Sequence, residues 1–358
     1  MGEFDRPAAG AVDVMIATPL EEHLVERIAA THERVRMWYD PGLLPIARYP
    51  GDHRGSPSFH RDLAGERDWT RALNQAEVLF GIPGDTPEGL AGAVRNCPRL
   101  RWVAATAAGA GEQVAAAGLS REELDRVAIT SAAGVHAGPL AEFAMFGLLA
   151  LTKDAAGLAA DKAARHWPDR LAPVGELDGR TVLVLGLGGI GRRVAKLASA
   201  FGMRVLGVKR SPGAAIDGVD EVHPTSALGE LLPLADAVVV TLPATSETTG
   251  LLDDKALDAL PRGALLVNVG RGAVIDEDAL AERLRSGHLG GAALDVFETE
   301  PLPPSSPLWE LDNVIVSPHI AALSAHENER IVELFRDNLH RLVAGEPLHN
   351  RIDPDVFY

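Results

Sequence analysis

The chain has 358 residues, 46% of them hydrophobic and 23% charged, an ordinary globular composition that is too long for one modest core, so two domains are expected. The 50 acidic residues outnumber the 34 lysines and arginines and give a formal charge of −16, which argues against nucleic acid and anionic membranes as partners. The first residues lack the basic and apolar regions of a signal peptide, and no run approaches about 18 apolar residues, so we expect a cytoplasmic protein.

The first part of the chain alternates apolar runs with amphipathic stretches. The apolar runs predict strands near residues 12–17, 35–39, 77–81 and 100–106, with a helix between the first two, which together indicate a parallel α/β domain. The only cysteine, Cys97, excludes an internal disulfide and a cysteine metal cluster. We interpret it as a buried filler, with a thiol nucleophile as the alternative, and predict no metal site.

Residues 40–65 are rich in proline, glycine and histidine and show no periodicity, which predicts a long loop. We hypothesise that this loop closes over the substrate when it binds; a solvated linker is the alternative. From Gly138 the sequence PLAEFAMFGLLALTKDAAGLAADKAA predicts several helical turns with Pro139 in the first. Because apolar side chains cover most of its circumference, this helix should be buried at a subunit or domain interface, and a homodimer is predicted.

A second series of short apolar runs follows, typical of the central strands of a doubly wound sheet. The runs are RTVLVLGLGGIG, MRVLGVKR, ADAVVVTLP, GALLVNVGRG, GGAALDVFE and NVIVSPHIAA. A helical stretch over residues 324–344 comes after that sheet is complete and is expected to return to the first domain. The predicted fold class is therefore α/β, with two Rossmann-like or flavodoxin-like parallel-sheet domains and a cleft between them. Residues 1–133 plus 323–358 form the predicted substrate-binding domain, and residues 134–322 the dinucleotide-binding one.

Gly186, Gly188 and Gly191 form a G-x-G-x-x-G that directly follows the strand TVLVL and opens a helix. In this context the glycines allow a tight turn, a close approach of backbone to a pyrophosphate and close packing of helix on strand. The N-terminus of the helix then offers unpaired N–H groups to the phosphates. A glycine-rich turn without a ligand is the alternative, but the flanking strand and helix favour dinucleotide binding.

Three polar residues follow three predicted strands of the second series: Arg271 after LLVNVG, Glu300 three residues after GAALDVF, and His319 after NVIVSP. The carboxyl ends of parallel strands lie on one edge of the sheet, where ligands bind, so the three side chains can converge there. Each residue alone has an ordinary structural explanation, as a surface arginine, a loop acid or a hydrogen-bonded histidine. Their occurrence together on one edge favours a catalytic site.

The chemistry of these three side chains fits the reduction of a 2-oxo acid. A histidine can give a proton to the developing alkoxide. A carboxylate on the other ring nitrogen orients the imidazole and favours its protonated form, a role for Glu300. A guanidinium binds the substrate carboxylate at two points and polarises the neighbouring carbonyl, a role for Arg271.

The sequence resembles the D-isomer-specific 2-hydroxyacid dehydrogenases. The similar stretches are VLGLGGIGRRVA, VVVTLPATSETTGLL, LLVNVGRGAVIDEDAL, GGAALDVFETEPLPPSSPLW and NVIVSPHIAA, which cover most of residues 180–322. The resemblance implies that Arg271, Glu300 and His319 are the substrate arginine, the carboxylate partner and the acid/base. It also implies that TAAGAGEQV at 106–114 is a substrate loop, in which Gly109 and Ala110 offer N–H groups to a carboxylate, although many relatives have glycine where Ala110 stands.

The resemblance further implies a nicotinamide dinucleotide as cofactor. It places Asp295 near the nicotinamide carboxamide and Thr241 to Pro243 near the adenosine half. The full predicted set of cofactor-binding residues is Gly186, Gly188, Gly189, Ile190, Gly191, Lys209, Arg210, Ser211, Thr241, Leu242, Pro243, Thr248, Val269, Gly270, Asp295, His319 and Ala321.

The choice between the two dinucleotides depends on the end of the strand MRVLGV. An NAD-preferring site usually has an acidic residue about 20 residues beyond the glycine loop, but no acid stands between Gly202 and Ile216. Lys209, Arg210 and Ser211 stand there instead and can hold a 2′-phosphate. NADP is therefore the predicted cofactor, with NAD possible; a solvated basic turn is the alternative.

Two other functions share this fold. A dinucleotide-sensing scaffold that acts as a corepressor would show no turnover, and the retained arginine, carboxylate and histidine argue against it. A formate or phosphite dehydrogenase would be distinguished by assay. Glyoxylate and hydroxypyruvate are the favoured type of substrate, but the sequence does not identify the pocket walls beyond C2. Candidates are Trp309 and the loop residues Arg48, Tyr49, His53 and Arg54, with simple packing as the alternative.

Overall fold

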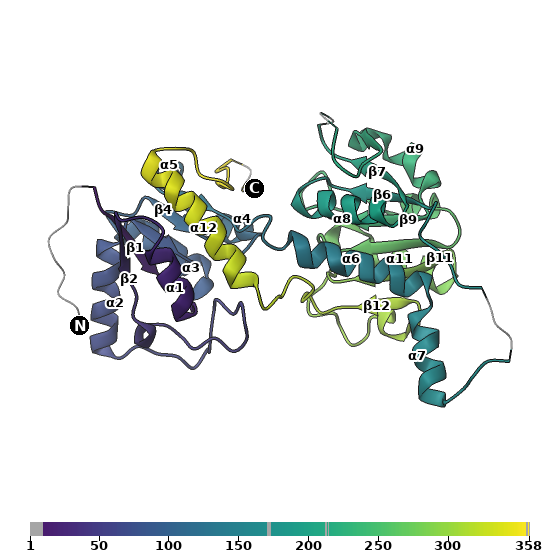
Figure 1. The fold of residues 1–358 in the computed structure, drawn as a ribbon, viewed down its shortest axis with the longest axis horizontal. Coiled ribbons are helices and arrows are strands. Elements are labelled where there is room, and N and C mark those ends of the chain that lie inside the picture. The colour runs from purple at the N-terminus through teal and green to yellow at the C-terminus, as the bar shows by residue number, and fades with distance from the viewer. Residues whose placement is uncertain (1–9, 170–172, 212, 214, 356, 358) are drawn as a thin grey trace. The chain divides into compact units, whose positions relative to one another are not determined.

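The computed structural model describes residues 10–169, 173–211, 213, 215–355 and 357 (Figure 1). The chain divides into two compact units. Met1–Val135 together with Leu323–Tyr358 form the first, which we call unit 1, and His136–Ala322 form the second, unit 2. Unit 1 is discontinuous in sequence, since it contains both the purple and the yellow ends of the ribbon in Figure 1.

Unit 1 contains a five-stranded parallel sheet in the order β2-β1-β3-β4-β5. The strands are short, and β1, β3 and β4 are buried along their whole length, as expected for central strands covered on both faces. The strands are β1 Val12–Ile16, β2 Val35–Trp38, β3 Val78–Phe80, β4 Trp102–Ala104 and β5 Ala128–Thr130. In this order the chain passes from β1 to β2 on one side and then crosses to β3 on the other side of β1. The switch point of the sheet therefore lies between the neighbouring strands β1 and β3.

Six helices accompany this sheet among the described residues: α1 Glu22–Ala29, α2 Leu63–Gln75, α3 Pro87–Asn96, α4 Ala110–Ala116, α5 Arg121–Arg126 and α12 Glu327–Ala344. Helix α12 comes from the far end of the chain and lies beside α1 (Figure 1). Its Phe335 stacks on Trp102 with ring centroids 4.8 Å apart and meets Phe80 edge to face at 5.1 Å. The aromatic centre of unit 1 therefore needs both ends of the chain.

The segment between β2 and α2 begins with a short 3-10 helix, η1 Pro41–Leu43, and continues through turns and bends over residues 44–62. Asp52 is buried within it and accepts hydrogen bonds from the Arg48 guanidinium, at 2.6 and 2.9 Å, and from the Gly55 N–H at 3.0 Å. These contacts, above all that of Arg48, hold the pKa of Asp52 well below its usual range. The predicted long loop is therefore tied together internally.

Unit 2 contains a seven-stranded parallel sheet in the order β12-β11-β10-β9-β6-β7-β8. Its strands are β6 Thr181–Leu185, β7 Arg204–Val208, β8 Glu221–His223, β9 Ala237–Val240, β10 Ala264–Asn268, β11 Leu289–Leu294 and β12 Val314–Val316. Sequence periodicity predicts six of these strands. It misses β8 because EVH is only three residues long and is partly exposed. The predicted α/β class with two parallel-sheet domains is confirmed.

The helices described in unit 2 are α6 Ala137–Thr152, α7 Ala155–Ala164, α8 Gly189–Ala200, α9 Leu228–Leu231, α10 Asp254–Asp258 and α11 Glu277–Arg285. Short 3-10 helices are η3 Thr225–Ala227, η4 Leu232–Leu234, η5 Gly272–Val274 and η6 Pro307–Glu310, with η2 Pro83–Asp85 in unit 1. By length and hydropathy no single described helix could cross a membrane, and α6 and α7 pass that test only as a pair bent by 62°.

The sequence predicts one buried helical stretch after Gly138, and this prediction is wrong in one respect. The helix breaks at Asp154, which has a left-handed φ of +52° and caps α7 by accepting from the Gly157 N–H at 3.1 Å. Helix α6 packs one face against the sheet, whereas every residue of α7 is at least partly exposed within the chain. The apolar composition of α7 thus does not serve the core of unit 2.

Candidate active site

The glycine loop joins β6 to α8. Gly186 has a φ of +95°, and a Cβ on Gly191 would lie 1.8 Å from the carbonyl oxygen of Gly186, so glycine is required at both positions. Thr241, just after β9, donates its hydroxyl to that same carbonyl at 2.8 Å. The helix therefore starts very close to the strand, and the neighbouring strand holds the turn in place.

The beginning of α8 is open. Gly188 and Gly189 are exposed, and a Cβ on Gly188 would meet no atom within 4 Å, while Ile190 is half-buried. The first N–H groups of a helix have no acceptor within the helix, and the helix dipole adds a positive partial charge. The open backbone and the twelve-residue helix behind it fit a pyrophosphate group.

Lys209, Arg210 and Ser211 follow β7 directly. Lys209 is half-buried, and its N–H donates to the carbonyl of His223 at 3.1 Å, which fixes the backbone at this point. The Arg210 and Ser211 side chains are exposed. Arg210 Nε lies 3.4 Å from Glu247 Oε2, and because both side chains are exposed this ion pair is weak and easily exchanged for another anion.

The segment from Thr241 to Thr248 folds into a turn next to the glycine loop. Thr248 donates its hydroxyl to the Pro243 carbonyl at 2.6 Å, and Leu242 lies so near Gly270 that a Cβ there would be 2.5 Å from the Leu242 carbonyl oxygen. Buried Val269 precedes Gly270 at the end of β10. The predicted residues after β9 and β10 are therefore neighbours.

Arg271 comes three residues after β10 ends at Asn268. The buried Asn268 side chain accepts from the Gly270 N–H and donates to the Arg271 carbonyl, each at 3.0 Å, and so fixes the turn from which the guanidinium extends. Arg271 Nη1 donates to the Gly270 carbonyl at 2.9 Å. The arginine is positioned by a side chain that the sequence analysis did not single out.

Glu300 and His319 form a hydrogen-bonded pair. Glu300 Oε2 lies 2.8 Å from His319 Nδ1, and Glu300 Oε1 accepts the Phe297 N–H at 3.0 Å. Both side chains are partly exposed. A carboxylate at Nδ1 keeps the proton on that nitrogen, which leaves Nε2 as the ring atom that can exchange a proton with a ligand. The strand before Glu300 ends at Leu294, so Glu300 follows it by six residues instead of the predicted three.

Asp295, the first residue after β11, anchors the turn that carries His319. Its Oδ1 accepts the Ser317 hydroxyl at 2.6 Å and the N–H groups of Ile320 and Ala321 at 2.9 and 3.0 Å. Asp295 is buried. Three donors on one oxygen fix the backbone on both sides of His319, a structural role in addition to the predicted place near the nicotinamide.

His319 has a left-handed φ of +56°. Such a conformation is uncommon for a residue other than glycine and costs on the order of 1–3 kcal/mol. The contacts of Asp295 and the Glu300 pair hold it. Strain of this kind, maintained by surrounding hydrogen bonds, is typical of residues whose position matters for function.

Gly109 and Ala110 lie in unit 1, at the start of α4. Gly109 has a φ of −90°, which any residue can adopt, and Ala110 is buried as the first helical residue. An alanine therefore fits this position without strain. Among the described residues, no three histidine, cysteine or carboxylate side chains come together as metal ligands.

Comparison with known proteins identifies the family. The model of the D-isomer specific 2-hydroxyacid dehydrogenase NAD binding domain matches residues 145–321. An (S)-sulfolactate dehydrogenase of Chromohalobacter salexigens is 37% identical over 218 residues, 61% of this chain and 71% of that protein. The chain belongs to the D-isomer-specific 2-hydroxyacid dehydrogenase family.

Two further members of this family are similar along much of the chain. A glyoxylate reductase of Korarchaeum cryptofilum is 35% identical over 237 residues, 64% of this chain and 70% of that protein. A solved D-isomer specific 2-hydroxyacid dehydrogenase of Xanthobacter autotrophicus, in complex with NADPH and MES, is 32% identical with a TM-score of 0.72 and covers 98% of this chain and 100% of its own. The protein is thus an NAD(P)-dependent 2-hydroxyacid dehydrogenase.

Asn268 and Ser317 contribute to the site although the sequence analysis did not predict them. Each is a polar residue at the end of an apolar run, LLVN and VIVS, and each is buried. Buried polar side chains must find partners, so a polar residue closing a central strand is a signal that could have identified both.

Proposed function

We propose that the protein reduces a small 2-oxo acid to the D-2-hydroxy acid, with Arg271, Glu300 and His319 as the reacting side chains. The observation that carries this proposal is the Glu300–His319 pair at 2.8 Å, on a left-handed residue that Asp295 anchors at the carboxyl edge of the sheet. We further propose that unit 1, residues 1–133 plus 323–358, is the substrate-binding domain.

In this proposal His319 moves the proton. Glu300 keeps a proton on Nδ1, so a protonated imidazole gives up the proton on Nε2 to the carbonyl oxygen at C2 as that oxygen becomes an alkoxide. The bound nicotinamide supplies the hydride that C2 receives. In the oxidation direction Nε2 takes the proton back from the hydroxyl.

Arg271 binds the substrate carboxylate. Asn268 fixes the backbone of the arginine, and a planar guanidinium can donate two parallel hydrogen bonds to a carboxylate. The Gly109 and Ala110 backbone is proposed to add N–H donors to the same carboxylate. The carboxylate is then held while the adjacent carbonyl is reduced.

The dinucleotide is proposed to lie along the carboxyl edge of the unit 2 sheet. The open loop of Gly186, Gly188 and Gly191 would hold the pyrophosphate, and the turn from Thr241 to Thr248 would lie beside the adenosine half of the dinucleotide. NADPH is proposed as the preferred form, because Lys209, Arg210 and Ser211 present two cations and a hydroxyl where an NAD site has an acid. That a similar solved dehydrogenase has NADPH bound supports this choice.

Initial rates with each dinucleotide test the cofactor proposal. The ratio of kcat/KM for NADPH to that for NADH should exceed one and should fall by about tenfold or more in Lys209→Asp combined with Arg210→Ala, mainly through KM. Lys196→Asp, an exposed lysine on α8 that pairs with Asp217, is the matched control. A parent enzyme that uses NADH equally well would contradict the assignment and leave the chemistry intact.

A panel of 2-oxo acids tests the reaction itself. Glyoxylate is the smallest member of the class and hydroxypyruvate has three carbons, and turnover is expected with these two first, in line with the name of a similar glyoxylate reductase. Similar proteins also include a sulfolactate dehydrogenase, so the group beyond C2 differs among relatives. The absence of turnover with every 2-oxo acid, together with oxidation of formate or phosphite, would replace the proposed function.

We also propose a homodimer formed through α6 and α7. Phe146 on α6 is 54% exposed and Leu158 on α7 is 62% exposed, and Trp167 follows on the same exposed segment. Large apolar side chains left exposed on neighbouring helices are typical of an interface between subunits. Light scattering at micromolar concentration should give twice the chain mass, and Phe146→Asp should lower it; a monomeric parent would contradict the proposal.

A further inference from the structure

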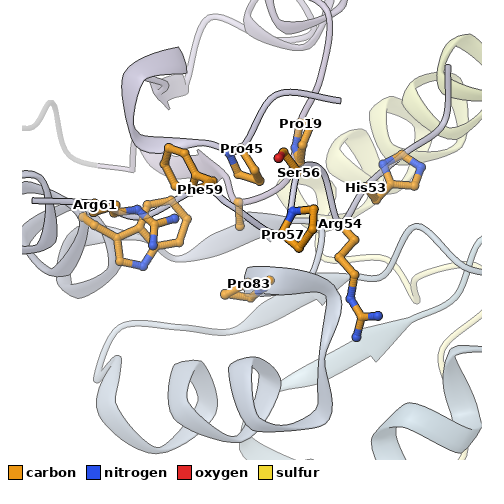
Figure 2. A pocket seen from close by; sticks show the side chains of 12 residues that line it. Pro19, Pro45, His53, Arg54, Ser56, Pro57, Phe59, Arg61 and Pro83 are labelled. Carbon is orange, nitrogen blue, oxygen red and sulfur yellow. The ribbon is translucent and has the colours of Figure 1, made fainter. Parts of the chain in front are cut away.

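A cavity of about 360 Å³ lies entirely within unit 1 (Figure 2). Ala17 and Pro19 line it from the chain just after β1, and Pro83 and Gly84 from the chain just after β3. The remaining walls come from the segment between β2 and α2 and from Trp69 of α2. The cavity is therefore situated at the carboxyl ends of β1 and β3, the switch point of the strand order 2-1-3-4-5, where open α/β sheets bind ligands.

Several buried polar atoms around this cavity have no partner among the described residues. His53 lines the cavity and is only 9% exposed, yet neither ring nitrogen makes a hydrogen bond. Thr18, between two lining residues, also keeps a buried hydroxyl without a partner. Buried polar atoms are nearly always hydrogen-bonded, so the unsatisfied ring of His53, which lines the cavity, indicates a molecule that binds there.

The charge of the cavity is positive. None of its twelve lining residues carries a carboxylate, although the whole chain has a formal charge of −16. Arg54 and Arg61 lie on opposite sides of it in Figure 2. Of the acids that act on His53, Asp52 pairs with Arg48 at 2.6 Å, Asp85 accepts from Gln113 at 3.2 Å and Glu21 accepts from Asn328 at 2.8 Å. The fourth, Glu327, is buried and does not line the cavity.

The two arginines differ in their freedom. Arg61 is fixed: its guanidinium lies 3.8 Å from the centre of the Trp69 ring, and its Nε donates to the Leu43 carbonyl at 2.7 Å. Arg54 is exposed and has no hydrogen-bond or ion-pair partner within the described part of the chain, and Figure 2 shows it extending past Pro57. An unpaired guanidinium at a cavity without acids favours a carboxylate, sulfonate or phosphate.

We propose that this cavity binds a second anionic group at the far end of the substrate, with Arg54 as the residue that determines specificity. The preferred substrate is then a 2-oxo acid that carries an anionic group beyond C2, while glyoxylate and hydroxypyruvate are the minimal substrates. His53 adds a hydrogen-bond donor, and the four prolines at the walls enclose the carbon chain. This inference rests on the proposed function, because it assumes that unit 1 binds the 2-oxo acid.

Initial rates with a matched pair of acids test the proposal. 2-Oxoglutarate and 2-oxopentanoate have the same carbon chain and differ only in a terminal carboxylate or methyl group. The ratio of kcat/KM for the first to that for the second should exceed one in the parent enzyme. In Arg54→Gln that ratio should fall by about 10- to 100-fold, the effect of losing one hydrogen bond between charged groups.

Arg71→Gln is the matched control. Arg71 is an exposed arginine of unit 1 on α2, outside the cavity, and pairs with Asp68. Its loss should change the ratio by less than about twofold, since charges exposed to solvent are screened. A ratio below one in the parent, an unchanged ratio in Arg54→Gln, or an equal fall in Arg71→Gln would each overturn the proposal.

Calorimetric titration separates this proposal from the proposed function. 2-Oxoglutarate added to the enzyme saturated with oxidised dinucleotide can bind but cannot be reduced. Tighter binding by the parent than by Arg54→Gln supports the cavity even if no 2-oxo acid is turned over. Turnover of 2-oxo acids with equal binding by the two proteins refutes the cavity and leaves the reaction intact.

Discussion

The edge of the unit 2 sheet and the edge of the unit 1 sheet both carry polar side chains, but the two are built differently. On unit 2, Asp295 and Glu300 follow β11 within six residues, His319 follows β12 within three, and they hydrogen-bond to one another or to the same turn. On unit 1, His53 and Arg54 come from an irregular segment, and neither side chain has a hydrogen-bond partner among the described residues. The hydrogen bonds of the first edge are made within the protein, whereas those of His53 and Arg54 are left for a ligand in the proposal above.

This difference shows which chemistry a sequence can reveal. A residue placed just after a parallel strand has its position set by the sheet, so its neighbours follow from the strand order. A residue in an aperiodic segment is placed by contacts that have no sequence period, such as the Asp52 bonds to Arg48 and Gly55. We therefore expect kcat to depend on the hydrogen bonds at the unit 2 edge, and the pH dependence of stability to depend on the burial of His53 at the unit 1 edge.

The largest effect is expected for His319→Ala. Loss of the proton donor should lower kcat by about 10² to 10⁴, the usual contribution of general acid catalysis. Dinucleotide affinity should persist, because the glycine loop and the turn after β9 are untouched. Steady-state rates and a fluorescence titration with the dinucleotide measure the two quantities. Near-normal kcat would remove His319 from the reaction.

Asp295→Ala should have the next largest effect. Three donors lose their acceptor, and the turn that holds His319 in its left-handed conformation is released. We expect kcat to fall by about 10- to 100-fold through misplacement of the imidazole, together with a lower melting temperature. Asp295→Asn keeps one oxygen at the same place and should recover part of both losses. Equal activity of the alanine variant and the parent would contradict an anchoring role.

Glu300→Gln tests the pairing with His319 directly. The amide keeps the size of the side chain but loses the charged oxygen that faces Nδ1, so the imidazole is held less firmly. We expect kcat for one 2-oxo acid to fall by about tenfold while dinucleotide affinity is retained. Steady-state rates measure this; a kcat equal to that of the parent would refute the pairing.

The smallest effect concerns stability and belongs to unit 1. Burial lowers the pKa of His53 below its ordinary value of 6.5, although Glu327, Asp85, Glu21 and Asp52 act in the opposite direction. Below the unfolded pKa the unfolded chain takes up a proton that the folded protein resists, so the contribution of His53 to stability is present at higher pH and is lost as the pH falls from about 6.5.

Urea unfolding at pH 7.5, 6.5 and 5.5 measures this contribution. His53→Gln should lessen the acid loss of unfolding free energy by about 1 kcal/mol per pH unit, since a single proton is involved. His60→Gln, an exposed histidine of the same segment, is the control and should follow the parent. Parallel curves for all three proteins would show that His53 is protonated equally in the folded and unfolded states.

Most of the fold could be predicted from the sequence, because apolar runs bounded by glycine and polar residues mark all the strands except β5 and β8. These two strands lie at sheet edges, and each is only three residues long, too short for a period to show. The break at Asp154 was not predicted because helical composition continues across it, although aspartate is a preferred N-cap residue and caps α7 here. The contact between Glu300 and His319 was predicted, whereas their catalytic roles remain predictions.

The unit 1 cavity could not have been predicted in the same way. His53 and Arg54 were candidates for the pocket walls, but a sequence does not show that a histidine is buried without partners. It also does not show which of several arginines is already engaged. Arg48, Arg54 and Arg61 are alike in the sequence, and only their contacts with Asp52 and Trp69 distinguish them.

Because unit 1 is discontinuous in sequence, its two parts are synthesised before and after unit 2. Phe335 of α12 completes the aromatic stack with Trp102 and Phe80, and it leaves the ribosome after all of unit 2. The growing chain can therefore finish the dinucleotide-binding unit while the central sheet of unit 1 still lacks one of its covering helices. Until α12 emerges, Phe80 of β3 and Trp102 of β4 lack the aromatic ring that packs on both of them, so unit 1 cannot complete its core before residue 335 has been made.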